Sequence, residues 1–153
     1  MHSVLVTGSN RGLGLEWVRQ YATAGWRVYA SCRVPEQADS LQQLAAQHPG
    51  VSIHRLDVTE PDQIRQMAAT IGDLPLDVLI NNAGIYRERW GRDRLGAIDY
   101  GDWQDTLAVN SLGAMRVSEA LIDNLARSER RLIVAISSHM GSIAEIGAAN
   151  DYA

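Results

Sequence analysis

The sequence predicts an α/β fold in which helices cover both faces of a parallel β-sheet, a doubly wound sheet. Two observations favour this fold class. Short apolar runs alternate with helical patterns along the whole chain, and strands separated by helices need crossover connections, which pair strands in parallel. The runs at 78–80 and 132–136 also lack polar alternation, as is typical of strands covered on both faces.

Five apolar runs predict the strands of this sheet. They lie at 3–8, 27–32, 51–56, 77–82 and 131–137. In doubly wound sheets, ligands bind beyond the carboxyl ends of the strands, so functional residues are expected at the end of each run.

Four helical patterns separate these runs. Leu13, Trp17 and Tyr21 recur at a spacing of four and predict the first helix, which Gly25 ends. The other helices are expected over about 41–47, from a cap at Thr59 to Gly72, and over about 102–127. In the last helix an apolar stripe is expected to face inward, and it comprises Trp103, Leu107, Ala114, Val117, Leu121 and Leu125.

Composition argues against several classes of function. The net charge of −4 gives no overall basicity for binding nucleic acid, and no run approaches the ~18 apolar residues of a membrane span. Cys32 is the only cysteine, which fits a reducing compartment, and the histidines lack metal-ligand spacing. With 153 residues, no repeat and no long linker, the chain is expected to form a single cytoplasmic domain, residues 1–153, that binds neither metal, membrane nor nucleic acid.

A glycine-rich turn, "TGSNRGLG" at 7–14, follows the first strand. Gly8, Gly12 and Gly14 leave room for a phosphate, and the next helix offers unpaired N–H groups and its positive dipole end. The turn therefore predicts a cradle for the diphosphate of a nucleotide. A tight strand-to-helix turn with no ligand would use the same residues.

The end of the second strand bears on the choice of cofactor. In dinucleotide-binding sheets an acidic residue here holds the ribose hydroxyls of NAD, whereas arginine suits the 2′-phosphate of NADP. The strand ends in Cys32 and Arg33, and Arg11 lies in the glycine turn. Each arginine alone fits a solvated surface charge, but the pair favours NADP.

The third and fourth strands also end in polar residues. Asp57 is placed to accept a hydrogen bond from an adenine amino group or, alternatively, to cap the next helix. Asn82, Ala83 and Gly84 belong to "NNAG" at 81–84, which offers amides and a small backbone to a ribose and nicotinamide, or forms a plain turn.

Two further polar residues lie near the end of the chain. Asn110 is expected on the inward helical face, where a structural hydrogen bond or a catalytic contact would satisfy its amide. Ser138 follows the last apolar run. The neighbouring His139 raises the idea of a hydrolase, but there is no G-x-S-x-G elbow to support it.

Taken together, these motifs resemble the short-chain dehydrogenase/reductase family. TG-x-x-x-G-x-G, the Asp57-Val58 step, NNAG, "VNSLG" around Asn110 and the serine pair 137–138 occur in the order and spacing of that family, from residue 3 to the end of the chain. The segments "ISSHMGSI" and "DYA" resemble the branch of C-factor-like proteins and small carbonyl reductases. The resemblance implies a Rossmann fold.

The resemblance also implies a reaction and a set of roles. A hydride moves between NADP(H) and a small-molecule carbonyl or alcohol substrate, Ser138 holds the substrate oxygen, and Asn110 supports a catalytic lysine through water. The resemblance further implies that the protein forms a homodimer or homotetramer. The residues implied in cofactor binding are Gly8, Arg11, Gly12, Leu13, Gly14, Arg33, Asp57, Val58, Asn82, Ala83 and Gly84.

The family's Tyr-x-x-x-Lys pair is incomplete in this sequence, because the chain contains no lysine. Tyr152 is either the catalytic tyrosine or the neighbour of a later one. We therefore expect the C-terminal part of the fold to be missing after the fifth strand, which would leave the apolar run 132–136 as an edge strand with side chains facing water. The alternative is a non-catalytic dinucleotide-binding or sensor module without the Tyr/Lys pair.

Overall fold

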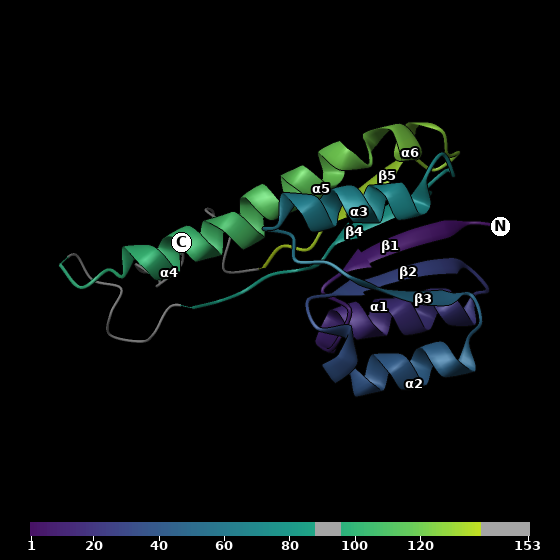
Figure 1. Ribbon diagram of the computed structural model, residues 1–153, viewed down its shortest axis with the longest axis horizontal. Helices are drawn as coiled ribbons and strands as arrows, with labels where there is room; N and C mark the ends of the chain where they lie inside the picture. Colours follow the sequence, from purple (N-terminus) through teal and green to yellow (C-terminus); the bar gives the residue numbers. More distant parts are fainter. Residues whose placement is uncertain (88–95, 139–153) are drawn as a thin grey trace.

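The structure, a computed structural model, describes residues 1–87 and 96–138 of the chain. Within them, one parallel sheet has the strand order β3-β2-β1-β4-β5 (Figure 1). Its strands are β1 (Ser3–Thr7), β2 (Arg27–Cys32), β3 (Val51–Arg55), β4 (Val78–Asn81) and β5 (Leu132–Ala135). The predicted doubly wound parallel sheet is confirmed.

Helices cover both faces of the sheet (Figure 1). One face carries α1 (Gly12–Thr23) and α2 (Asp39–Gln47), and the other carries α3 (Pro61–Ile71), α5 (Ala114–Ala120) and α6 (Ile122–Ala126). A short 3₁₀ helix, η1 (Pro35–Gln37), follows β2, while α4 (Tyr100–Leu107) and a π-helical turn, η2 (Ala108–Gly113), precede α5. None of the helices in the described part of the chain is long and apolar enough to cross a membrane.

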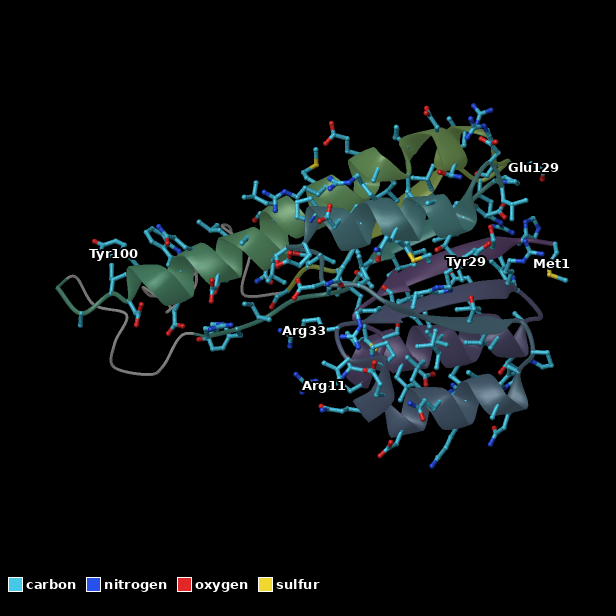
Figure 2. The ribbon with its side chains drawn as sticks, in the orientation of Figure 1. Met1, Arg11, Tyr29, Arg33, Tyr100 and Glu129 are labelled. Atoms are coloured by element: carbon cyan, nitrogen blue, oxygen red, sulfur yellow. The ribbon has the colours of Figure 1, made fainter. Side chains whose placement is uncertain are left out.

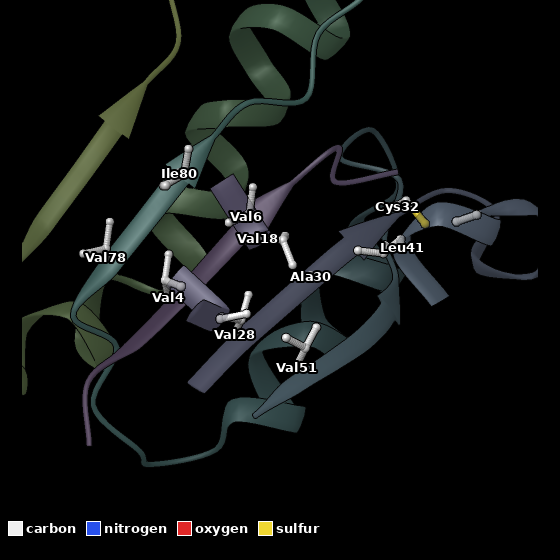
Figure 3. Close-up of a cluster of buried hydrophobic side chains, with 12 residues drawn as sticks. Val4, Val6, Val18, Val28, Ala30, Cys32, Leu41, Val51, Val78 and Ile80 are labelled. Carbon is white, nitrogen blue, oxygen red and sulfur yellow. The ribbon is translucent and has the colours of Figure 1, made fainter. Parts of the chain in front are cut away.

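Alternation along the central strands divides the core into two clusters. Val4 and Val6 of β1 belong to one cluster, together with Val18 of α1 and Leu41 of α2 (Figure 3). Leu5 belongs to the opposite cluster, with side chains of α3 and α5. The sheet is therefore buried on both faces at its centre, which explains why its strands read as continuous apolar runs.

The first helix is where predicted, but its buried face differs from the predicted stripe. Gly14, Val18 and Ala22 are buried, whereas Leu13 is 63% exposed. Small residues occupy the contact because the start of α1 lies against the end of β1: a Cβ at Gly14 would lie 2.3 Å from the carbonyl oxygen of Gly8.

The expected single helix over 102–127 is interrupted in the structure. The π-helical turn η2 separates α4 from α5, and Leu121 separates α5 from α6. The inward stripe is correct only in its second half, since Val117 is buried, whereas Trp103 is 41% exposed. Figure 1 shows the reason: α4 extends beyond the sheet, so it has no sheet surface to pack against.

Among residues 1–87 and 96–138, the fifth strand lies at the edge of the sheet, as expected, and pairs only with β4. Its apolar composition is typical of a covered strand, yet Leu132 and Ile133 are 46% and 41% exposed.

Candidate cofactor site

The carboxyl ends of β1 and β4 meet at the point where the winding of the sheet reverses. Thr7, the last residue of β1, accepts hydrogen bonds at Oγ1 from the backbone N–H groups of Asn82 and Ala83, each at 3.0 Å. The side-chain amide of Asn82 donates to the carbonyl oxygens of Thr7 and Gly8 at 2.9 and 3.1 Å. These bonds join the glycine turn to the NNAG segment, at the position where doubly wound sheets bind ligands.

The three glycines of the turn have two different roles. Gly8 has a φ of +69°, and a Cβ there would lie 2.9 Å from the Cα of Ala83. Gly14 can make the contact with Gly8 described above because it has no Cβ. Gly12 has a φ of +56° and nothing within 4 Å of a Cβ position. Gly8 and Gly14 thus allow the turn to pack against β4, while Gly12 leaves open space in front of the helix.

That open space lies at the N-terminus of α1. Arg11 is the N-cap in an extended conformation, and its side chain makes no capping hydrogen bond. The first-turn N–H groups of Gly12, Leu13 and Gly14 have no carbonyl of a preceding turn to bond, and the helix dipole adds partial positive charge. The geometry suits a diphosphate, as the sequence predicts.

A pair of buried serines attaches the glycine turn to the end of β2. The Ser9 N–H donates to the Ser31 carbonyl at 2.8 Å, and the Ser31 N–H donates to Ser9 Oγ at 3.0 Å. This link brings Arg11 and Arg33 to the same edge of the sheet, and both are exposed. Figure 2 labels the two side chains near each other, on the side of the sheet from which α4 extends.

Two residues that the sequence does not predict, Arg55 and Glu36, lie beside Arg33 at this edge of the sheet. Arg55 ends β3 opposite Cys32 of β2, and its Nη1 donates to the Arg33 carbonyl at 2.9 Å. Its Nη2 pairs with the Glu36 carboxylate. The signal that could have found Arg55 is positional, because neighbouring parallel strands end at the same edge of a sheet.

Asp57 and Val58, which follow β3, have different surroundings: Asp57 is hydrogen-bonded to Thr59, and Val58 is buried. Asp57 Oδ1 accepts from the N–H and the hydroxyl of Thr59, at 2.9 and 2.7 Å. The cap expected at Thr59 is wrong by one residue, since Glu60 is the N-cap of α3 and caps it with no side-chain bond. Val58 is 5% exposed and its side chain packs tightly against Gly113, so this side chain is not open to a cofactor.

Asn110 lies in the π-helical turn η2 and is exposed, contrary to the predicted inward position. Both polar atoms of its amide are nevertheless hydrogen-bonded: Oδ1 accepts from the Ile85 N–H and Nδ2 donates to the Ile85 carbonyl, each at 2.9 Å. Arg87 adds a second tie through ion pairs with Asp102 and Asp105. The segment after NNAG is therefore held along α4 and η2.

Ser138 is exposed and follows β5, whose Ala135 is in register with Asn81 of β4. It therefore lies beyond the same edge of the sheet as the glycine turn. Tyr152 and His139 lie outside the described residues.

Burial suppresses the ionised forms of two side chains near the edge. The pKa of the Cys32 thiol is raised chiefly by burial, which keeps it protonated at neutral pH. The pKa of His54 is lowered by burial, and its ring contacts Ser52 Oγ at 2.7 Å. Across 1–87 and 96–138, His, Cys, Asp and Glu form no cluster of three or more that could hold a metal.

A doubly wound sheet whose switch point carries a glycine turn and an exposed helix N-terminus defines a Rossmann-type protein of the dinucleotide-binding class. Residues 2–152 match the sequence model of the family described as short chain dehydrogenase. The chain belongs to this family of dehydrogenases.

Known proteins of similar sequence and structure agree with this membership. Retinol dehydrogenase 5 of Mus musculus is 32% identical over 151 residues, covering 94% of this chain and 45% of the relative. The NADPH-bound carbonyl reductase from chicken fatty liver has a TM-score of 0.87 at 33% identity and covers 96% of this chain. A putative short-chain dehydrogenase/reductase from Burkholderia multivorans with bound NADP has a TM-score of 0.84 at 29% identity over 98% of this chain.

The chain is shorter than these proteins. It spans 63% and 64% of the two solved structures, and about half the length of the curated relatives it matches, between 45% and 56%.

Proposed function

We propose that this protein binds NADP(H) and serves the transfer of a hydride between that cofactor and a small-molecule carbonyl or alcohol substrate. One observation carries the choice of NADP(H): β2 ends at Cys32 and is followed by Arg33, with no carboxylate at either position, and Arg11 lies at the same edge. A guanidinium suits a 2′-phosphate, whereas the ribose hydroxyls of NAD prefer an acid. The NADPH and NADP named with the similar structures support this choice.

The residues at the sheet edge fit the parts of such a cofactor. The open N-terminus of α1, with Gly12, Leu13 and Gly14, would hold the diphosphate, and the two arginines would hold the 2′-phosphate. The cofactor, when bound, supplies or accepts the hydride. Asp57 and the Val58 backbone would contact adenine, and Asn82, Ala83 and Gly84 would line the ribose, with Asn82 and Ala83 also binding Thr7 to hold the turn in place.

For the reaction itself, we assign Ser138 to hold the substrate oxygen and Asn110 to position the catalytic lysine. These roles require a Tyr-x-x-x-Lys pair, and this sequence has no lysine. A free tyrosine with a pKa near 10 is a poor base at neutral pH, so a cation beside it is needed to favour the phenolate. A second candidate is a non-catalytic dinucleotide-binding or sensor module, which would work without the Tyr/Lys pair.

We further propose that the protein is cytoplasmic and forms a homodimer or homotetramer. Several large apolar side chains are exposed along α4, η2 and α5, and they support an association surface there. They are Tyr100, Trp103, Leu107, Leu112 and Met115. Light scattering coupled to gel filtration tests the association, and a strictly monomeric mass would exclude it.

Titration of the protein with NADPH and with NADH, followed by protein or nicotinamide fluorescence, tests the central proposal. We expect tighter binding of NADPH. Equal affinities, or a preference for NADH, would refute the assignment of NADP(H). Carbonyl-dependent oxidation of NADPH would then separate the enzyme from the non-catalytic module, which binds the cofactor without turnover.

A further inference from the structure

Arg55, at the end of β3, contacts the segment that follows β2, residues 33–37. Its guanidinium reaches two groups at once, the carbonyl oxygen of Arg33 at 2.9 Å and the carboxylate of Glu36. Glu36 belongs to η1, the 3₁₀ helix that follows directly on the segment carrying Arg33. One side chain therefore ties both the start and the middle of this segment to the end of β3.

Glu36 is the acidic residue in this segment. Its pKa is lowered first by a hydrogen bond from its own backbone N–H and then by Arg55, so it is ionised at neutral pH. A carboxylate near the end of β2 is suited to accept ribose hydroxyls and repels a 2′-phosphate. If Glu36 had no ion-pair partner, its carboxylate would favour NAD over NADP.

We propose that Arg55 is a positioning residue for cofactor selection: it restrains the Glu36 carboxylate and fixes the backbone that presents Arg33, and so preserves the preference for a 2′-phosphate. This inference rests on the proposed NADP(H) site. Arg55 acts through Glu36 and the Arg33 backbone, and the proposal does not need it to touch the phosphate. The expected effect is modest because both partners are largely exposed, at 49% and 65% of their side-chain areas.

The test uses 2′,5′-ADP and 5′-ADP, which differ in the 2′-phosphate and require no turnover. Calorimetric titration of the full chain is compared for the wild type, Arg55→Gln, Glu36→Gln and the double variant. Arg65→Gln is the matched control, because Arg65 forms an exposed ion pair with Asp62 within α3. We expect Arg55→Gln to lower the affinity for 2′,5′-ADP about two- to fivefold and to lower the affinity for 5′-ADP less.

The double variant separates restraint of Glu36 from simple loss of positive charge. If Arg55 acts through Glu36, Arg55→Gln costs less affinity for 2′,5′-ADP when Glu36→Gln is already present than it does in the wild type. Equal losses in both backgrounds, or a loss no larger than that of Arg65→Gln, would overturn the inference. If Arg55→Gln does not fold, Arg55→Lys keeps the charge but not the two-pronged geometry, and unchanged selectivity in that variant would equally overturn it.

Failure of the proposed function gives a different result. Wild-type protein that binds 5′-ADP as tightly as 2′,5′-ADP refutes the NADP(H) assignment itself. Wild-type protein that prefers 2′,5′-ADP, with no specific effect at Arg55, refutes only the positioning role.

Discussion

The side-chain amide of Asn82 donates to the backbone carbonyls of Thr7 and Gly8 at 2.9 and 3.1 Å, so the end of β4 holds the glycine turn that follows β1. The Thr7 hydroxyl completes the arrangement by accepting the N–H groups of Asn82 and Ala83. Segments more than seventy positions apart are thereby joined at the switch point of the sheet. The shape of the cofactor cradle depends on this junction.

Thr7→Val tests the junction. The substitution keeps the side-chain shape but removes the oxygen that accepts from both N–H groups, at a position that is only 1% exposed. The Asn82 N–H keeps the Ile80 carbonyl as an acceptor at 3.0 Å, so the Ala83 N–H is the one left without a partner. We expect a loss of about 1 to 3 kcal/mol in the free energy of unfolding, measured with urea. Thr70→Val is the control, since the Thr70 hydroxyl is exposed and bonds only within α3. Equal losses in the two variants would contradict the role of Thr7.

Gly14→Ala and Gly12→Ala should separate packing from ligand access. A Cβ at Gly14 would lie 2.3 Å from the Gly8 carbonyl oxygen, so we expect Gly14→Ala to lower stability by about 1 to 3 kcal/mol. At Gly12 the space is open and only the positive φ is strained, which costs about 1 to 2 kcal/mol. Weaker NADPH binding by Gly12→Ala, measured on folded protein, is expected if a phosphate approaches there; unchanged binding would place the diphosphate elsewhere.

Arg33→Asp should invert the cofactor preference. One charge-assisted contact to phosphate is worth roughly 1.5 to 3 kcal/mol, or about ten- to a hundredfold in affinity for NADPH. Arg27→Asp makes the same charge change at the opposite end of β2 and should leave the ratio of NADPH to NADH affinities nearly unchanged. A similar change of the affinity ratio in both variants would mean that the net charge, and not the position of Arg33, selects the cofactor.

Asn110→Leu removes both hydrogen bonds to the Ile85 backbone. Because Asn110 is exposed, we expect a small stability loss, about 0.5 to 1.5 kcal/mol for each bond, and faster hydrogen exchange at the Ile85 amide. Gln104→Leu on α4 provides an exposed control. Unchanged protection of the Ile85 amide would show that the amide pair does not hold this segment.

Ser138→Ala tests the proposed contact with the substrate oxygen. In protein that turns over a carbonyl substrate, we expect a lower kcat with unchanged affinity for NADPH, because the serine is assigned to the substrate and not to the cofactor. Steady-state kinetics and a binding titration measure the two quantities. Full turnover by the variant would remove Ser138 from the mechanism.

Stability should fall on acidification because of His54. Burial lowers its pKa from the ordinary value of 6.5, so the unfolded chain binds more protons than the folded one as the pH drops below about 6.5. The free energy of unfolding is therefore highest above that pH and decreases below it. His54→Gln should reduce the difference between urea titrations at pH 7.5 and 5.5, while His48→Gln should keep it; an unchanged difference in His54→Gln would assign the acid sensitivity to other groups.

The sequence by itself determined the elements of this fold and most of the residues at its edge. Apolar runs and helical spacing report local burial, and they placed β1 to β5 and the first three helices within a few residues. The glycine turn and the strand-end residues Arg33, Asp57 and Asn82 follow from the same pattern, because parallel strands must end at one edge.

Tertiary structure alone decided which of these residues meet. The order β3-β2-β1-β4-β5 brings Asn82 to Gly8 and Arg55 to Glu36, and such contacts between distant segments leave no periodic trace in the sequence. Helical spacing also cannot report how the π-helical turn rotates the side chains, so it predicted Asn110 to face inward although the residue is exposed in η2. Burial needs a neighbour to pack against, and only the folded chain determines where that neighbour lies.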